Sequence, residues 1–380
     1  MKVLDFIRAN KNWEEALAAA PYCIKATRDG DYVLLKYNQL ESDFNEEIVR
    51  ECRGCIFWMP EGNNEYADVV CYPFDKFGNY GESYAPEIDW SHASVLEKVD
   101  GSLIKIWRYN GEWHISTNGT IDARNAPTAV EGVSFYDIVM RALEKNGNPR
   151  DFFNSLYSDY TYMFELVSPE TRVTIEYPDT ALYYLGARNM LHFNEIEHYW
   201  LPADDEFNYF IQLPKEYPLA SLEECLDAVN KMTRDEEGFV VCDNQFRRVK
   251  IKSPEYLIAA HLRNNGVITV RRVVEMMRAN QLDDFCAYAP QYKDFVDRVT
   301  DTYTLIAKAL ELWYIEVFSA MHREKNKKLH EIISQGVPKA FQDYCYKRFN
   351  NKVENAFSYL DKQTIGRLTD WIKEYMKDAV

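Results

Sequence analysis

The sequence has no long apolar run, and this absence excludes several classes of protein. A transmembrane helix needs about 20 consecutive, mostly apolar residues, and a secretory signal peptide needs a shorter apolar segment near its start. Neither pattern is visible in the 380 residues. We therefore expect no signal peptide, no membrane partner and a cytoplasmic location.

The sequence is also poor in basic residues compared with acidic ones. It contains 44 lysines and arginines against 60 aspartates and glutamates, which gives a net charge of −16. This balance excludes a protein that coats nucleic acid through overall positive charge. A polyanionic ligand would have to bind in a local basic cleft.

The cysteine spacing offers little metal or redox chemistry. Cys52 and Cys55 form the only C-x-x-C among eight cysteines, and no second pair or nearby histidine pair completes a zinc set. We interpret the cysteines as reduced, mostly buried thiols of a cytoplasmic protein. A redox or metal role for this one pair is the alternative.

Two regions of different periodicity make up the chain. Strand-like segments dominate up to about residue 258, and Asn110-Gly111 between residues 103–109 and 112–117 is a strong hairpin signal. Beyond about residue 258, apolar residues recur at three- and four-residue steps, as in amphipathic helices. The predicted fold class is α+β: an antiparallel-sheet domain with short N-terminal helices (residues 1–258), followed by an all-helical C-terminal domain (residues 259–380).

Individual elements can be placed within these two regions. Further strands are predicted at residues 32–37, 55–58, 161–167, 181–185, 238–242 and 248–252. Helices are predicted at residues 3–8, 13–20, 135–145, 222–232 and 295–317, with a break between helices at residues 336–338.

The most informative segment is Lys98-Val99-Asp100-Gly101-Ser102. Its lysine follows an apolar stretch and precedes a predicted strand, where a lysine can be a covalent nucleophile toward a nucleoside triphosphate. Gly101 lets the backbone bend close to a ligand, and Asp100 supplies a polar contact. The motif K-x-D-G also occurs in solvated surface turns, so that alternative stays open on the motif alone.

A second signal is a pair of lysines on one predicted strand. Alternation along residues 248–252 directs Lys250 and Lys252 to the same face, while Val249 and Ile251 point inward. Two ammonium groups on one strand face are well placed to bind a polyphosphate.

Four segments occur together in a specific order. They are residues 51–54 (Glu-Cys-Arg-Gly), 74–79 (Phe-Asp-Lys-Phe-Gly-Asn), 98–102 and 250–256 (Lys-Ile-Lys-Ser-Pro-Glu-Tyr). In this order the chain resembles the covalent nucleotidyltransferases, and within that superfamily the phage-type RNA ligase 1 family. The resemblance covers roughly residues 30–256 and implies an adenylyltransferase domain there. The helical C-terminal region also fits that family and is expected to select RNA.

The resemblance implies an ATP-dependent RNA ligase. Lys98 would attack the α-phosphate of ATP to form lysyl-AMP, AMP would pass to an RNA 5′-phosphate, and a 3′-hydroxyl would then displace it. Nearby cations, such as Lys250, Lys252 and a metal ion, would lower the pKa of Lys98, and a requirement for Mg²⁺ or Mn²⁺ is expected. The expected partner is RNA with 5′-phosphate and 3′-hydroxyl ends, cleaved tRNA among the candidates. The enzyme is expected to be a monomer.

The resemblance also implies which residues bind the nucleotide phosphates. Lys250 would contact the α-phosphate and Lys252 the leaving pyrophosphate. Arg53 and Lys76 would hold the β- and γ-phosphates, for which the fork of an arginine is well suited.

The remaining implied roles concern carboxylates and aromatic residues. Glu165 would contact the ribose, and Glu237 would bind the metal ion. Asp100 and Gly101 would shape the turn at the nucleophile. Tyr37 and Tyr256 match family positions, where a packing role is an equal alternative, and Glu165 could also be a solvated strand end.

One position departs from the family pattern. Thr117 stands where a lysine is common, in a segment of the form S-K-x-G, so no phosphate-binding role is carried over to it. Arg188 is a candidate for supplying a nearby cation in its place.

Two competing interpretations remain. A DNA ligase or a GTP-using capping enzyme would usually carry an OB-fold after the catalytic domain, and no such series of strands follows Tyr256. A non-catalytic RNA-binding relative would be free to lose Lys98, Glu237 and Lys252, all of which are present.

Overall fold

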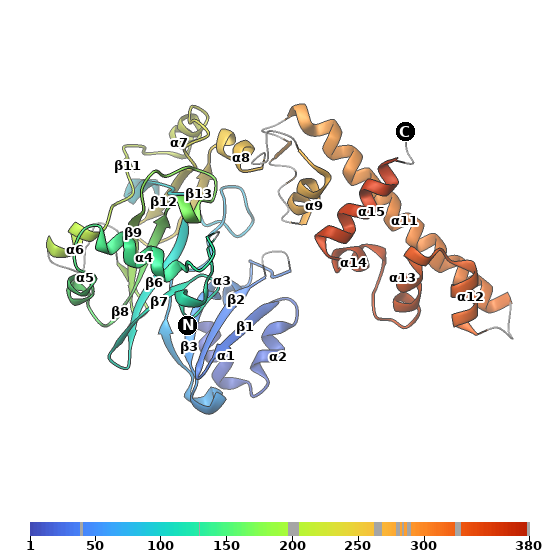
Figure 1. Cartoon of the computed structure of the whole chain (residues 1–380), viewed down its shortest axis with the longest axis horizontal. Coiled ribbons are helices and arrows are strands. Elements are labelled where there is room, and N and C mark those ends of the chain that lie inside the picture. The colour runs from blue at the N-terminus through green and yellow to red at the C-terminus, as the bar shows by residue number, and fades with distance from the viewer. Residues whose placement is uncertain are drawn as a thin grey trace. The chain divides into compact units, whose positions relative to one another are not determined.

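The computed structural model describes residues 1–38, 41–128, 130–196, 205–261, 268–278, 282, 285–286, 290–323 and 328–377. The chain divides into two compact units, Met1–Ala260 and His261–Val380. The sequence placed this division two residues earlier, after residue 258. Figure 1 shows the strands of the first unit in blue, green and yellow-green, and most helices of the second in orange and red.

The first sheet has four antiparallel strands in the order β1-β2-β3-β4. They are β1 (Ile24–Asp29), β2 (Tyr32–Tyr37), β3 (Arg53–Trp58) and β4 (Asp68–Cys71), with α3 (Glu47–Glu51) leading into β3. Val33 and Leu35 share a core with residues of α1 (Lys2–Ala9) and α2 (Trp13–Ala18), whereas Leu34 belongs to a different core. This alternation is the period-2 pattern of a strand that is buried on both faces.

The second sheet has five strands in the order β10-β9-β8-β6-β7. They are β6 (Ser102–Tyr109), β7 (Glu112–Thr117), β8 (Tyr160–Val167), β9 (Ala181–Asn189) and β10 (Glu195–Ile196). Asn110 and Gly111, with φ of 50° and 84°, form the tight turn of the predicted hairpin. Residues of α4 (Phe135–Glu144), α5 (Pro149–Ser155) and α6 (Asp205–Phe210) share its core, while Trp107 packs with Leu34 of the first sheet.

The third sheet lies beside α7 and has the strand order β11-β5-β12-β13. Its elements are β5 (Ala93–Glu97), β11 (Glu216–Tyr217), β12 (Gly238–Asp243), β13 (Arg248–Lys252) and α7 (Leu222–Val229). Val249 and Ile251 are buried with residues of α7, whereas Lys250 and Lys252 line a cavity. The predicted alternation along this strand is therefore confirmed.

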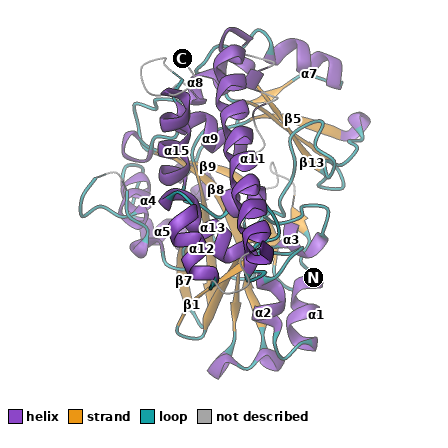
Figure 2. Ribbon diagram, turned by 90° about the vertical axis from the view of Figure 1, so that its right-hand side faces the viewer, coloured by secondary structure: helices purple, strands orange, loops and turns teal. Residues whose placement is uncertain are grey.

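The described part of the second unit contains helices and no strand. After α8 (Pro254–His261) come α9 (Val270–Arg278), α11 (Lys293–Arg323), α12 (Leu329–Gly336), α13 (Lys339–Phe349), α14 (Ala356–Asp361) and α15 (Ile365–Lys377), purple in Figure 2. The long α11 contacts α12, α13, α14 and α15. Its buried face includes Val299, Ile306 and Leu310, as the apolar spacing predicted. No helix within the described ranges is long and apolar enough to cross a membrane.

The predicted α+β class is confirmed, because antiparallel sheets and helices make up the first unit. Each strand and helix predicted for that unit is present, and α12 and α13 are separated at the predicted break. Within the described part of this unit, the sequence did not predict five strands and four helices: β1, β4, β5, β10, β11, α3, α5, α6 and α8.

Candidate active site

The side chain of Lys98 meets two charged residues that are distant in sequence. Lys98 directly follows β5, and its backbone N–H donates to the carbonyl of Gly238 at 2.9 Å. Its Nζ lies 2.6 Å from Oε2 of Glu237, and Nζ of Lys252 lies 3.1 Å from Oε1 of the same carboxylate. Neighbouring strands β5, β12 and β13 thus bring together the predicted nucleophile, the predicted metal ligand and one predicted phosphate-binding lysine.

Two glycines allow this close approach of chains. A side chain at Gly238, whose φ is +130°, would collide with the carbonyl of Ile251 on the paired strand. A side chain at Gly101 would collide with the carbonyl of Leu166. Each glycine adjoins a site residue, so the backbone next to Lys98 and Glu237 tolerates no larger residue.

Asp100 holds the turn that follows Lys98. One carboxylate oxygen accepts hydrogen bonds from the backbone N–H groups of Thr174 and Ile175 at 2.7 and 2.6 Å. The other accepts from the hydroxyl of Tyr256 at 2.8 Å. Asp100 is buried and both of its carboxylate oxygens are engaged in these contacts, so it anchors the turn.

A cavity of about 850 Å³ opens beside Lys98. Its polar wall includes Lys36, Arg53, Lys98, Glu165, Lys250 and Lys252. Its apolar wall includes Phe74, Phe77, Leu96, Leu103, Leu185 and Val240. A large concave site with an apolar side and a few converging charged groups is typical of a nucleotide-sized ligand.

Four basic side chains in or beside the cavity have no acidic partner among the described residues; three of them line the cavity and Lys76 does not. Lys36, Arg53, Lys76 and Lys250 form no ion pair with any described residue. Nη1 of Arg53 is buried without a hydrogen-bond partner. In a chain of net charge −16, such a concentration of unpaired positive charge is the local basic cleft that a polyanion requires.

The ligand-free site keeps Lys98 protonated, because its carboxylate neighbours outweigh the lowering expected from the cations. Burial alone would lower the pKa of Lys98, but Glu237 and Glu165 outweigh burial and raise it above its usual value. The carboxylates are the nearest charges, which is why the cations do not prevail. Burial also raises the pKa of Glu237, but Lys98 and Lys252 outweigh this effect and hold it below its usual value.

Burial also shifts the pKa values of other residues at the site. Burial raises the pKa of Glu165 to about 7, although Lys98 opposes the rise. Burial and the neighbouring cations Lys76 and Arg53 hold the pKa of Lys250 well below its usual range. Burial, aided by Arg53, lowers the pKa of Lys76 to about 8. Such shifts, clustered in one cleft, are characteristic of functional sites.

The predicted aromatic residues flank the cavity without lining it. Nζ of Lys76 lies 5.5 Å from the ring centre of Tyr37 and 5.1 Å from that of Phe44. Nζ of Lys252 lies 5.7 Å from the ring centre of Tyr256. These cation–π contacts position the two lysines, and Tyr256 in addition donates its hydrogen bond to Asp100.

Arg188 does not supply a cation to the cavity, so that part of the sequence interpretation is wrong. Its guanidinium pairs with Glu195 at 2.7 Å and lies 3.9 Å from the ring centre of Tyr72. Arg188 is buried and absent from the residues that line the cavity. Its charge is neutralised by Glu195 in a buried ion pair between β9 and β10 of the second sheet.

Comparison with known proteins places these residues in a family. The family model for RNA ligase matches residues 51–256, more than half of the chain. The chain belongs to the phage-type RNA ligase 1 family. Within the matched range lie all the predicted site residues except Tyr37.

Three known proteins are similar to this chain. An RNA ligase of Rhodothermus phage RM378 is 27% identical, over 78% of each chain. A protein of Autographa californica nuclear polyhedrosis virus, given the name bifunctional polynucleotide kinase/RNA ligase, is 33% identical over 73% of this chain. The match spans only 40% of that viral protein. A solved archaeal ATP-dependent RNA ligase is 13% identical with a TM-score of 0.46, over 78% of this chain and 77% of its own.

Sequence reasoning missed several residues of the ligase cavity. Lys36 lies before the matched range, and a lone lysine on a strand is usually solvent-exposed. Phe74 and Phe77 give the cavity aromatic walls: the ring of Phe77 is within cation–π distance of Lys250, at 4.7 Å. Arg248, which also lines the cavity, lies 4.2 Å from the ring centre of Phe74.

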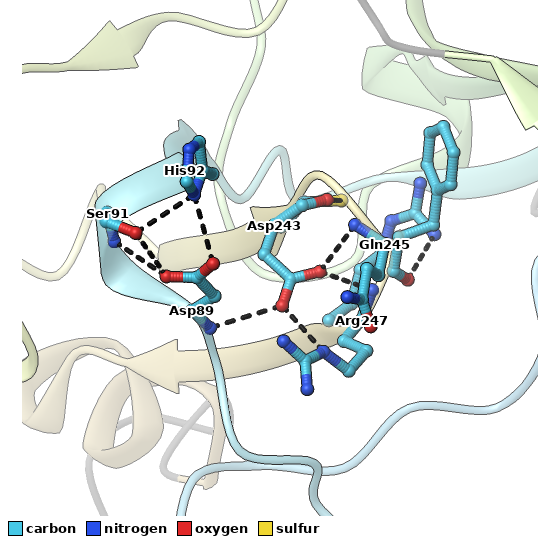
Figure 3. Close-up of polar contacts among 9 residues, drawn as sticks. Asp89, Ser91, His92, Asp243, Gln245 and Arg247 are labelled. Atoms are coloured by element: carbon cyan, nitrogen blue, oxygen red, sulfur yellow. Dashed lines mark hydrogen bonds and ion pairs between the residues drawn. The ribbon is translucent and has the colours of Figure 1, made fainter.

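One rim of the cavity is held by a polar network that sequence reasoning also missed (Figure 3). Asp243 accepts hydrogen bonds from the backbone of Asp89, Gln245 and Arg247 and from Nε of Arg247 at 2.7 Å. Nδ1 of His92 lies 3.0 Å from Oδ2 of Asp89. The network joins the segment before β5 to the β12–β13 turn, and it places His92 and Asp243 at the cavity wall.

Proposed function

We propose that this protein is an ATP-dependent RNA ligase that joins 5′-phosphate and 3′-hydroxyl RNA ends. The observation that carries the proposal is the placement of Lys98. Its amine pairs with Glu237, which also pairs with Lys252, at the wall of a cavity large enough for a nucleotide and rich in unpaired cations. Membership of the RNA ligase family supports the same chemistry.

In the first step, the neutral amine of Lys98 attacks the α-phosphorus of ATP. A nitrogen–phosphorus bond forms, the bond between the α-phosphorus and the bridging oxygen breaks, and pyrophosphate leaves. The ammonium must first lose a proton, which the neighbouring carboxylates oppose. A triphosphate held by the unpaired cations brings its electrophilic α-phosphorus to the amine, and positioning of this kind supplies much of the rate in phosphoryl transfer.

The cavity walls divide the work of binding ATP. Lys250 contacts the α-phosphate, Lys252 the pyrophosphate, and Arg53 with Lys76 the β- and γ-phosphates. An anion satisfies the buried Nη1 of Arg53 and stabilises the charged form of Lys250.

The sugar and base bind against Glu165 and the apolar lining of the cavity. Glu165 accepts from the ribose hydroxyls, and it does so best when ionised, which the neighbouring Lys98 favours. The base stacks on the apolar wall that includes Phe74 and Phe77.

The carboxylate of Glu237 fits a divalent cation. Mg²⁺ is usually held by one or two carboxylates together with substrate phosphates and water, and Mn²⁺ accepts the same oxygen ligands. Glu237 is ionised, with its pKa held low by two ammonium groups. A divalent cation held there would neutralise charge on the phosphates. With its carboxylate so engaged, Glu237 would no longer stabilise the ammonium of Lys98, which would favour the nucleophilic amine.

Two further transfers complete ligation. An RNA 5′-phosphate oxygen attacks the phosphorus of lysyl-AMP, the bond to Lys98 breaks, and an RNA-adenylate results. The RNA 3′-hydroxyl then attacks the 5′-phosphate and AMP leaves. The helical second unit is proposed to select the RNA, with nicked stem-loops such as cleaved tRNA as the substrates to test.

The test uses ATP or GTP labelled at the α-phosphate together with Mg²⁺. We expect a covalent protein adduct with ATP that pyrophosphate reverses, and sealing of nicked RNA stem-loops. Preferential labelling by GTP would indicate a capping enzyme, and preferential sealing of DNA would indicate a DNA ligase. Absence of any adduct from folded protein would contradict the proposal and favour a non-catalytic RNA-binding relative.

A further inference from the structure

Lys36 is a cavity residue that none of the proposed steps uses. It lies on β2 outside the range that matches the RNA ligase family, which begins at residue 51. In the β2–β3 pairing, Lys36 stands opposite Arg53, so the two side chains are neighbours on one face of the first sheet. Both line the same cavity.

The amine of Lys36 is placed at a specific part of the cavity wall. Nζ of Lys36 lies 3.4 Å from where a side-chain carbon at Gly119 would stand. The loop at Gly119 follows β7 and lines the cavity together with Thr117 and Asn118. Lys36 is only partly buried, so its amine can reach a ligand from this wall.

Lys36 lies near two other basic residues, Arg53 and Lys105. Burial lowers the pKa of Lys105, and although Cys71 and Cys55 oppose this effect, Lys36 and Arg53 lower it further. Nζ of Lys105 donates to the carbonyl of Gly54, directly after Arg53. Lys36 itself has no ion pair within the described ranges.

This arrangement raises the energy of the ligand-free protein. Three basic groups, Lys36, Arg53 and Lys105, lie together, one of them fully buried, and no acidic residue pairs with any of them in the described structure. A bound anion with several oxygens would relieve the repulsion and satisfy the buried Nη1 of Arg53. Clustered cations without carboxylates therefore indicate a phosphate site that extends past Arg53.

We propose that Lys36 is a phosphate-binding residue that contacts the terminal phosphates of ATP in the first step. The proposal rests on the proposed function, which assigns the β- and γ-phosphates to Arg53, the cross-strand neighbour of Lys36. Lys36 thereby supplies the positive charge that Thr117, on the same cavity wall, does not. An RNA phosphate is the alternative source of the same chemistry, and the experiment separates the two.

The experiment compares full-length wild-type protein with Lys36→Ala, Lys36→Arg and Lys25→Ala. Lys25 is a matched control because it stands opposite Lys36 in the β1–β2 pairing, is exposed and does not line the cavity. A general electrostatic effect of losing one positive charge from this sheet would be similar at both positions. Two rates are measured: formation of the protein–AMP adduct at varied ATP, and sealing of pre-adenylated RNA, which needs no triphosphate.

We expect Lys36→Ala to raise the ATP concentration for half-maximal adduct formation roughly tenfold or more, the scale of one charged hydrogen bond. Sealing of pre-adenylated RNA should stay within about twofold of wild type. Lys36→Arg should recover most of the ATP dependence because it keeps the charge, and Lys25→Ala should match wild type. Unchanged ATP dependence in Lys36→Ala overturns the proposal, as does a loss confined to sealing, which would assign Lys36 to RNA.

A binding measurement separates this proposal from the proposed function. Isothermal titration with inorganic tripolyphosphate needs neither a base nor a reaction. Weaker binding by Lys36→Ala than by Lys25→Ala supports the phosphate site even if wild-type protein forms no adduct, in which case only the proposed function fails. Equal tripolyphosphate binding by Lys36→Ala and Lys25→Ala overturns the phosphate site. A structural role is indicated instead if Lys36→Ala and Lys36→Arg both have a lowered melting temperature and both lose ATP use and sealing to the same extent, and this result also overturns the proposal.

Discussion

At the scale of single residues, the charges of the ligand-free site oppose the first step of the proposed reaction. The amine of Lys98 is 2.6 Å from Glu237, and the carboxylates keep it protonated. An ammonium has no lone pair with which to attack phosphorus, so the protein should be inert until ligands change the local charge. The unpaired cations, which include Arg53 and Lys250, are proposed to bring such a ligand to the site, because they attract a triphosphate to the cavity wall near Lys98.

Replacing Lys98 tests this chemistry directly. Lys98→Ala should form no AMP adduct above background, since no other group at this position can carry AMP. Lys98→Arg should fail as well, because a guanidinium remains protonated and is a poor nucleophile. The measurement is radiolabel transfer from α-labelled ATP, with circular dichroism as the control for folding. An adduct of undiminished yield in Lys98→Ala would show that the nucleophile lies elsewhere.

Glu165 should make the stability of the ligand-free protein depend on pH. Its pKa is about 7 in the folded state, mainly through burial, against about 4.3 in an unfolded chain. Between these values the unfolded state releases the proton first, so stability is fully present below about pH 4 and is lost as pH rises through 7. Glu165→Gln stays neutral and should remove this loss, of order 1–3 kcal/mol.

The measurement is urea unfolding of metal-free protein at several pH values between 5 and 8. The stability of Glu165→Gln relative to wild type should increase with pH across this range and level off above it. A constant difference between the two proteins would show that Glu165 is ionised throughout.

At the scale of elements, the strands that carry the site were largely predictable. β12 and β13 are apolar at alternate positions, and burial of Val249 and Ile251 forces Lys250 and Lys252 toward the cavity. In the sequence, Gly238 at the start of β12 was noticeable only as part of a motif. The need for glycine there comes from tertiary structure, because the carbonyl of Ile251 occupies the space that a side chain would need.

Gly238→Ala should therefore weaken the β12–β13 pairing. The new methyl group meets Ile251, and the φ of +130° is unfavourable for alanine, so we expect a loss of about 1–3 kcal/mol in unfolding free energy. Gly30→Ala is a suitable control, since Gly30 has a φ of +56° but open space around it. Equal losses from the two substitutions in urea unfolding would mean that backbone strain alone, without the collision, sets the cost.

Other elements could not be read from the sequence, for identifiable physical reasons. β1 is mostly exposed beyond Ile24 because it is an edge strand, so its pattern lacks apolar alternation. β10 and β11 are two residues long, too short for any periodicity. Lys36 was missed for a related reason: only the β2–β3 register reveals that it faces Arg53. Conversely, the sequence suggested that Arg188 could supply a cation to the site, but in the fold Arg188 forms an ion pair with Glu195.

At the scale of the whole molecule, the residues proposed to bind the nucleotide and the long amphipathic helices lie in different units. The residues of the candidate site all lie in Met1–Ala260, and the helix α8 ends at His261. The first unit has separate cores for each of its three sheets, built from its own helices and strands. It thus has the internal packing that an independently folding domain needs.

A truncated protein that ends after His261 should therefore keep self-adenylylation. Every residue proposed to contact ATP is retained, including Lys36, Lys98 and Lys252, so AMP transfer to Lys98 should stay within about tenfold of the full-length rate. Preference among RNA substrates should be lost, because the helices proposed to read RNA shape are removed. Size exclusion and circular dichroism must first show a soluble, folded protein, because removing the helices would expose any apolar surface they cover.

The informative comparison is then between ATP use and RNA choice in the same preparation. A panel of nicked stem-loops and single strands, supplied pre-adenylated, reports on RNA choice without any contribution from the first step. If the folded truncation seals this panel with the rates and ranking of the full chain, the helical unit does not select RNA. If it instead loses the adduct while remaining folded, the helical unit takes part in the first step, and the division of labour between the two units is wrong.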